Sequence, residues 1–231
     1  MFAWEWLRRT PAYRHSWART RGSGLVAQAR AAHAFGLVAL APPTLAATEA
    51  RPIWLARHDP QVLRAHVLSE AAVAQELLDI RRLAVSAAIG FDEDDAEHWR
   101  LVVAGHAIRI DVHDGTLLGG PTLLRFELQG LAAVRPKLPP LDLLVRGALG
   151  LRPRPTPPRE GRAARWIDEL RTADALDDGA TQHEIARALF EASVPASGWR
   201  TEGESYRLRV QRLVRAARAR LRNPLDRAWF R

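Results

Sequence analysis

The chain has 231 residues, of which 47% are apolar and 26% are charged, and it contains no cysteine. A chain of this length and composition folds into one large domain or two small ones, which excludes a disordered or fibrous protein. The lack of cysteine excludes disulfide bonds, thiolate zinc sites, iron–sulfur clusters and a cysteine nucleophile.

Neither end of the sequence reads as a targeting or membrane segment. The longest apolar run, at residues 34–41, is too short to cross a bilayer and is followed by two prolines. The N-terminal aromatic residues precede Arg8 and Arg9, whereas a secretory signal starts with basic residues and continues into a longer apolar stretch. We therefore expect a soluble, cytoplasmic protein with no membrane partner, and we predict no cofactor.

Aromatic residues are concentrated in the first 20 positions. Thr10 and Pro11 are typical of a helix N-cap and first turn, which places Tyr13 and Trp17 on one face of a helix. So many aromatic side chains do not stay in water, so they pack against the rest of the chain or against a partner. The sequence favours the intramolecular contact and leaves a subunit interface open.

The middle of the chain changes from an ambiguous pattern to a strand pattern. Residues 62–68 and 71–82 fit either short helices or extended segments. Residues 108–113 alternate between apolar and polar side chains, which indicates a half-buried strand. The Asp114-Gly115 pair that follows predicts a hairpin turn.

A proline-rich stretch divides the chain. Residues 152–161 read Arg-Pro-Arg-Pro-Thr-Pro-Pro-Arg-Glu-Gly, a sequence that no helix or central strand tolerates. The predicted arrangement is an N-terminal domain at 1–150, with helical structure at 1–82, a small antiparallel sheet at 83–130 and a helix at 141–149, then a linker at 151–161 and a C-terminal domain at 162–231.

Three helices are predicted beyond the linker. The first spans residues 162–173. The second begins after Thr181, and Glu184 completes a capping box with it. The third and longest spans residues 204–222. We therefore predict an α+β protein whose all-helical C-terminal domain resembles a helix-turn-helix unit.

The third predicted helix separates apolar from basic residues. At 100° per residue, Val210, Val214 and Leu221 fall in one stripe, while arginines occupy the other faces. Residues 200–231 contain 10 basic side chains against 3 acidic ones, an excess that attracts polyanions. A GC-rich coding sequence also explains arginine in place of lysine, but it does not explain the clustering. The alternative is a solvated basic helix, although solvated faces usually mix both signs.

Three stretches of the chain resemble one proteobacterial family. They are the opening FAWEWLRRTPAYR, the following AFGLVALAPP and the C-terminal EIARALF…WRT…SYRLRVQRLVR. The family joins a transcriptional regulator-like region to the type VI secretion transcription factor DNA-binding domain, and the resemblance covers residues 1–50 and 160–225. It implies self-association and promoter binding at type VI secretion or conjugative-element genes.

The predicted function is therefore sequence-selective binding of double-stranded DNA by a homo-oligomeric transcriptional activator, with RNA polymerase or a related regulator as a further partner. The family's Trp-x-Thr and Ser-x-Arg-x-Arg pattern falls on Trp199, Thr201, Ser205, Arg207 and Arg209. We assign base edges to the last three of these residues. Phosphate contacts are assigned to Arg200, Arg212, Arg215 and Arg218, and contacts of the second helix with the DNA backbone to Gln182 and Arg187. The predicted contact residues are Gln182, Arg187, Arg200, Thr201, Ser205, Arg207, Arg209, Arg212, Arg215 and Arg218.

Two other functions compete with this prediction. A metal-dependent enzyme would need the densest polar cluster to converge on one ion. Turn and surface roles explain each of those residues singly, so we predict no catalytic or metal site. The second is a protein-interaction antagonist of a related regulator, which could lose its exposed arginines, whereas this chain keeps them. The polar cluster consists of His98, His106, Asp111, His113 and Asp114.

Overall fold

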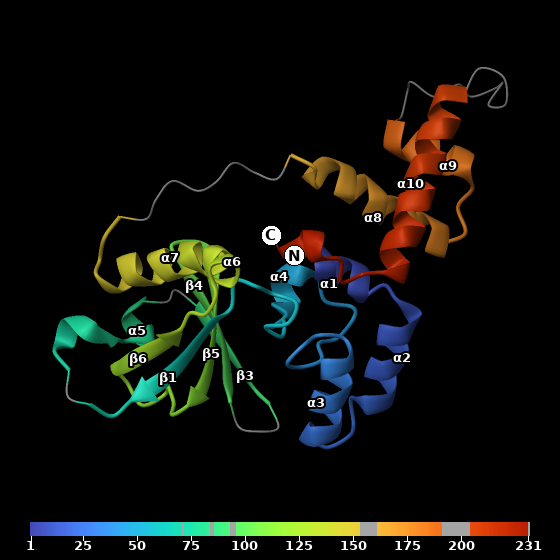
Figure 1. Cartoon of the computed structure of the whole chain (residues 1–231). Helices are drawn as coiled ribbons and strands as arrows, with labels where there is room; N and C mark the ends of the chain where they lie inside the picture. Colours follow the sequence, from blue (N-terminus) through green and yellow to red (C-terminus); the bar gives the residue numbers. More distant parts are fainter. Residues whose placement is uncertain (71, 84–85, 93–95, 153–160, 191–203, 231) are drawn as a thin grey trace. The chain divides into compact units, whose positions relative to one another are not determined.

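The computed structural model describes residues 1–70, 72–83, 86–92, 96–152, 161–190 and 204–230 (Figure 1). Its contacts divide the chain into two compact units, which are described separately. The sheet unit comprises His15–Thr156 and Arg227–Arg231, and the helical unit comprises Met1–Arg14 and Pro157–Asp226. This division differs from the predicted one in placing the N-terminal residues with the C-terminal helices.

The sheet unit is built around a six-stranded sheet with the strand order β2-β6-β1-β5-β4-β3. β1 pairs in parallel with β5, and every other pairing in this sheet is antiparallel. The predicted α+β class is confirmed. The strands are β1 (Leu63–Leu68), β2 (Leu77–Leu78), β3 (Ser86–Phe91), β4 (Glu97–Val103), β5 (His106–Asp114) and β6 (Thr122–Glu127).

The sheet begins earlier in the chain than the sequence predicts. β1 and β2 lie inside residues 1–82, so the prediction of helical structure throughout that range is wrong at these two strands. The prediction of an antiparallel sheet at 83–130 misses them and the parallel pairing of β1 with β5. Periodicity alone does not separate a short apolar strand from a helix. Here β1 is extended because it pairs with β5 on one side and β6 on the other.

One face of the sheet forms the core of the unit. Leu63, Ile108 and Ile110 are completely buried there, and α7 (Leu138–Ala148) adds Leu144 to the same core. Gly147 lets the helix approach its neighbours closely, because a Cβ at this position would lie 2.9 Å from the Val103 Cγ1 atom of β4 and 2.5 Å from the Leu83 Cδ1 atom. A larger residue at 147 would force these side chains or the helix to shift.

Short helices connect and flank the strands. α2 contains the division between the two units, which follows Arg14. The helices that remain in the described part of this unit are α2 (Pro11–Thr20), α3 (Leu25–Ala34), α4 (Ala47–Ala50), η1 (Ala74–Glu76), α5 (Ile80–Leu83), α6 (Leu131–Val134), η2 (Arg135–Lys137) and η4 (Arg227–Phe230).

The helical unit packs α1 (Phe2–Leu7) with α8 (Ala163–Asp177), α9 (Gln182–Phe190) and α10 (Glu204–Arg222). The bounds of α10 agree with the prediction. α8 runs one turn further than the predicted 162–173, because Asp174 and the residues after it stay helical.

The N-terminal aromatic residues are core residues, which confirms the intramolecular interpretation for those that are buried. Trp4, Trp6 and Tyr13 are fully buried, and Trp4 meets Tyr13 edge-on at 5.3 Å between ring centroids. Phe2 packs against Trp166 of α8 in the same geometry, at 5.0 Å. Edge-to-face contacts of this kind add about 0.5–1.5 kcal/mol to the burial of the rings.

No helix in the described ranges combines the length and the apolar character that crossing a membrane requires.

Candidate nucleic-acid interface

α9 begins with the capping box that the sequence predicts. The Thr181 backbone N–H donates to the Glu184 carboxylate at 2.7 Å, and the Glu184 N–H donates to the Thr181 hydroxyl oxygen at 3.3 Å. Two backbone donors at the helix start are thereby satisfied. The hydrogen bonds from Thr181 also lower the pKa of Glu184.

α9 and α10 share a small apolar core. Ile185 and Ala186 of α9 pack with Val210 and Val214 of α10, and all four are buried. The spacing of the α10 pair, four residues apart, places both side chains on one face of the helix. This contact fixes which face of α10 turns inward and therefore which face remains outside.

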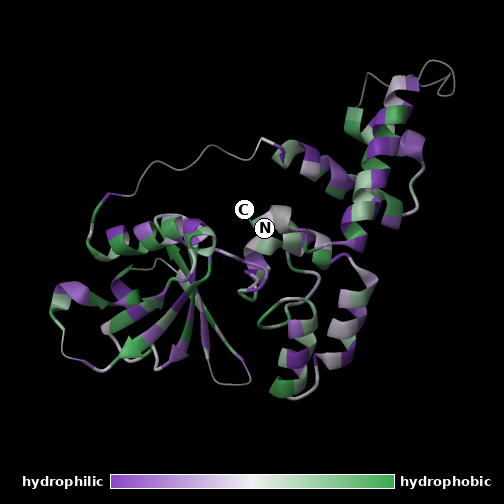
Figure 2. Cartoon of the chain, in the orientation of Figure 1, coloured by the Kyte–Doolittle hydropathy of each residue, from purple (hydrophilic) through white to green (hydrophobic). Residues whose placement is uncertain are grey.

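The outer face of α10 is basic. Arg212, Arg215, Arg218 and Arg222 are exposed, and they follow one another at intervals of three or four residues. Figure 2 shows the hydrophilic and hydrophobic residues that alternate along α10. We call these four residues the arginine face.

Several carboxylates of the helical unit pair with residues outside this face. Asp174 accepts two hydrogen bonds from Arg9, at 2.6 and 2.8 Å, and Asp226 accepts one from Arg220 at 2.9 Å. Glu5 also pairs with Arg9. In the part of the chain that the structure describes, no carboxylate pairs with the arginine face, so its positive charge is not neutralised from within.

A buried carboxylate holds α8 against α10. The Glu169 side chain is 2% exposed and accepts a hydrogen bond from Arg165 at 3.0 Å. Its other oxygen lies 3.6 Å from the Arg220 Nε atom, close enough for an ion pair and too long for a good hydrogen bond. Sequence analysis missed this site, although Glu169 stands in the apolar stripe of α8, between Trp166 and Leu170.

Arg209 and Arg207 occupy opposite flanks of α10. The Arg209 guanidinium lies over the Phe190 ring at 4.2 Å from its centroid, a cation–π contact with the last residue of α9. Arg207 is half-buried and has a partner. Two residues apart on a helix means about 160° between the side-chain directions, so these two arginines do not face one groove side by side.

The other predicted contact residues divide into three groups. Gln182 and Arg187 are exposed on α9, and Ser205 is exposed in the first turn of α10. Arg200 and Thr201 lie outside the described residues. Arg222 was not predicted, although its spacing from Arg215 and Arg218 is the signal that would have added it.

Two family models match the chain. Residues 141–223 match a family described as T6SS, Transcription factor, DNA binding domain, and residues 1–37 match the Proteobacterial transcriptional regulator-like domain. These segments are similar to the two domains that the sequence resemblance names. The predicted resemblance is therefore confirmed, and the first match begins at 141, inside α7, earlier than the predicted 160. No curated protein matches the chain.

Both descriptions are those of transcriptional regulators, and neither names an enzyme. They place the protein among DNA-binding transcription factors in a type VI secretion context. The match at 1–37 contains α1, and the match at 141–223 contains all of α8, α9 and α10. The arginine face thus belongs to the segment whose family description is DNA binding.

Two members of the predicted polar cluster, His98 and Asp111, pair with each other and with neighbouring residues, whereas Asp114 pairs with His66. His98 lies between Asp111, at 2.9 Å, and Asp92, at 3.0 Å, and Arg109 donates to Asp111 at 2.8 Å. Burial lowers the pKa of His98, but the two carboxylates outweigh it and the net pKa is raised. β5 was predicted to be half-buried, whereas its polar residues Arg109 and Asp111 are buried too. Within the described residues, no group of three or more side chains is arranged to hold a metal ion.

Proposed function

We propose that this regulator binds double-stranded DNA sequence-selectively through α10, in a helix-turn-helix-like unit. The observation that carries the proposal is the arginine face: four exposed arginines on one side of a 19-residue helix whose other side is packed. Four like charges on one face repel one another in water. Phosphates of a duplex turn that repulsion into attraction and release counterions.

Arg212 and Arg215 are proposed as the central phosphate contacts, because they lie in the middle of the exposed face. Arg218 and Arg200 extend these contacts toward the two ends of the helix. Gln182 and Arg187 of α9 would contact the backbone of the duplex.

Base recognition is proposed for the first turns of α10. Ser205 and Arg209 are four residues apart and share one flank of the helix, beside Arg212. The stacking on Phe190 restricts Arg209 to few rotamers, and restricted guanidinium groups suit bidentate contacts to guanine. Arg207, on the other flank, and Thr201 complete the proposed set.

We further propose that the protein activates type VI secretion or conjugative-element genes as a homo-oligomer. When several weakly binding DNA-binding units belong to one oligomer, binding of the first raises the effective concentration of the others at the promoter. RNA polymerase or a related regulator is the proposed further partner. Sedimentation at micromolar concentration tests the oligomer, and a strict monomer contradicts it.

The decisive experiment compares Arg215→Ala with Arg125→Ala, an exposed arginine on β6 whose loss changes the net charge equally. Genomic fragments recovered by the purified protein supply the DNA, and binding is measured across a salt series. Arg215→Ala should weaken all sequences alike and reduce the slope of log affinity against log salt by about one unit. Arg125→Ala should leave the slope unchanged.

Arg209→Ala tests base recognition separately. It should cost about 1–3 kcal/mol on the recovered site and relax the preference at one position. If both Arg215→Ala and Arg209→Ala leave binding and its salt dependence intact, α10 is not the DNA-binding face.

A further inference from the structure

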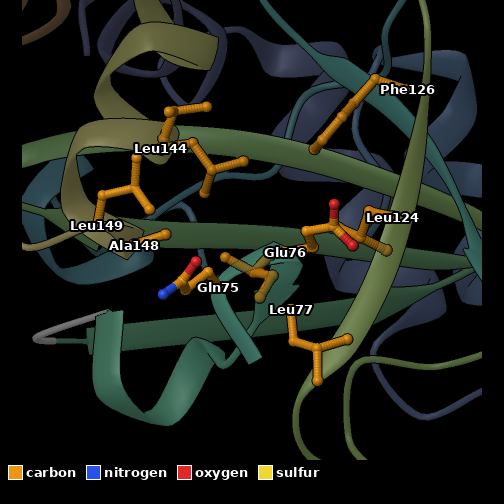
Figure 3. Close-up of a pocket in the computed structure, with 10 residues that line it drawn as sticks. Gln75, Glu76, Leu77, Leu124, Phe126, Leu144, Ala148 and Leu149 are labelled. Atoms are coloured by element: carbon orange, nitrogen blue, oxygen red, sulfur yellow. The ribbon is translucent and has the colours of Figure 1, made fainter. Parts of the chain in front are cut away.

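The sheet unit contains an apolar hollow between α7 and the edge of the sheet formed by β2 and β6 (Figure 3). Leu144 and Ala148 line it from the helix, and Leu124 and Phe126 line it from β6. Its volume is about 160 Å³. Figure 3 shows side chains of α7, β6 and η1 around one space, together with Leu77 of β2.

The hollow exists because the face of α7 that carries the large side chain of Leu144 carries only the small side chain of Ala148 one turn later. Leu144 and Ala148 are four residues apart and lie on the same face of the helix. Leu144 is almost completely buried, whereas the single methyl group of Ala148 leaves the space beyond it unfilled. Gly147, beside it, holds the helix close to the sheet, so the helix backbone forms a fixed wall.

The rim of the hollow keeps apolar side chains in water. Val145 is 45% exposed and Leu149 is 51% exposed, and both line the opening. Gln75 and Glu76 of η1 stand at the same opening and supply the polar groups (Figure 3). An apolar floor with a few polar groups at its mouth is the usual composition of a small-molecule site.

We propose that this hollow binds a small uncharged aromatic or short-chain aliphatic molecule. Apolar cavities of about 150 Å³ take one benzene-sized ring, which matches the volume found here. A carboxylate ligand is disfavoured, since it would lose water against leucine side chains and meet the Glu76 carboxylate. The Gln75 amide offers both a donor and an acceptor to a hydroxyl group.

A second hollow continues from the first and shares Leu77 and Ala148 with it. Its volume is about 330 Å³, and Asp79 and Arg82 add charged groups to its wall. A molecule longer than one ring would place its polar end there. The inferred ligand is therefore an apolar body with, at most, one neutral hydrogen-bonding end.

The inference goes beyond the proposed function and does not depend on it, since every lining residue belongs to the sheet unit. The hollow nevertheless touches a helix that lies partly in the family-matched segment at 141–223. Arg146 of this helix also donates two hydrogen bonds to the Arg152 carbonyl oxygen, at 2.9 and 2.7 Å. A bound molecule would thus rest on the helix within which the family-matched segment begins.

The test measures binding of phenol and 1-hexanol to the full chain by titration calorimetry, with benzoate as the charged comparison. Ala148→Leu fills the hollow, and Ala133→Leu, on the exposed side of α6, is the matched control. We expect saturable binding of both probes to the wild type and to Ala133→Leu. Ala148→Leu should weaken it at least tenfold, and benzoate should bind at least tenfold more weakly than phenol.

Methyl chemical shifts of Leu144 and Val145 in the wild-type chain provide a readout that needs no substitution, should Ala148→Leu fail to fold. Phenol should shift these signals more than those of Leu131, which is exposed on α6. The inference is overturned if the probes do not saturate, if both leucine variants bind equally, or if phenol leaves the two methyl signals unchanged. A change of oligomeric state in Ala148→Leu without probe binding also overturns it and makes the hollow a protein contact.

Discussion

Arg9 and Arg220 of the helical unit lie against carboxylates, whereas the arginine face of α10 has no carboxylate within the described residues. Both groups belong to one small unit and carry the same side chain. Arg9 joins Glu5 of α1 to Asp174 of α8, and the acidic neighbours raise its pKa against the opposing effect of burial. The first group therefore holds helices together, while the second is left for an external anion.

The largest effect should follow from removing three members of the arginine face together. Arg212→Ala, Arg215→Ala and Arg218→Ala in one chain should reduce DNA affinity on the order of 100-fold and lower the salt slope by about three units. The free energy of unfolding should stay within about 0.5 kcal/mol of the wild type, since all three side chains are exposed. An unchanged salt slope, or a large loss of stability, would remove the distinction between the two groups.

Glu169→Ala tests the arginines that are paired with carboxylates, because Glu169 is a partner of Arg220. Loss of this buried carboxylate removes one of the acidic partners of Arg220, while the ion pair with Asp226 stays. We expect a loss of about 2 kcal/mol in the free energy of unfolding, less than for a fully buried pair because Arg165 is largely exposed. Urea denaturation provides the measurement, and Glu169→Gln, which keeps the shape and one acceptor, should cost roughly half as much. Equal stability of Glu169→Ala and wild type would mean that the contact between α8 and α10 does not need the charge.

Arg9→Ala should have a smaller effect of about 1 kcal/mol, because Asp174 is half-exposed and part of the Coulomb attraction is screened. Thermal unfolding against Arg171→Ala, an exposed arginine of α8, measures it. The control should differ from wild type by less than about 0.5 kcal/mol. If the two substitutions have the same effect, the contact of Arg9 with Glu5 of α1 and Asp174 of α8 contributes nothing to the free energy of unfolding.

The smallest expected effect is on the pH dependence of the free energy of unfolding. It concerns His98 of the sheet unit, which, like Arg9 and Arg220, is paired with carboxylates. Its folded pKa is raised, so protonated His98 stabilises the fold below its unfolded pKa of about 6.5. That contribution is lost as the pH rises through the raised folded value. Unfolding in urea from pH 6 to pH 9 should therefore show a steeper decline for wild type than for His98→Gln. Parallel curves would contradict it.

The bounds of α10 and the cap of α9 could be predicted because their signals are local. The stripe of Val210 and Val214 repeats at the helical period, and Thr181 stands three residues before Glu184. The arginine face could be predicted from the same helical period, since residues on the side of a helix opposite a buried stripe are exposed.

The remaining features depend on contacts between distant positions. β1 becomes a strand because β5 and β6, some 45 to 60 positions later, pair with it. The contact of Arg209 with Phe190 joins two helices, and no spacing in either helix announces it. Glu169 stands in an apolar stripe, but nothing in the local pattern of α8 identifies Arg220 as its partner. Local patterns fix which face of a helix is apolar, but they do not identify what lies against it.

The placement of Met1–Arg14 with the C-terminal helices has a consequence for biosynthesis. Phe2 packs against Trp166, and Arg9 donates to Asp174, so these two residues are synthesised more than 150 codons before the partners that they contact. A polypeptide interrupted before α8 lacks the Trp166 ring against which Phe2 packs and the Asp174 carboxylate that pairs with Arg9. The helical unit, whose N-terminal and C-terminal parts pack together, would thus be complete only in molecules whose translation has run through α10.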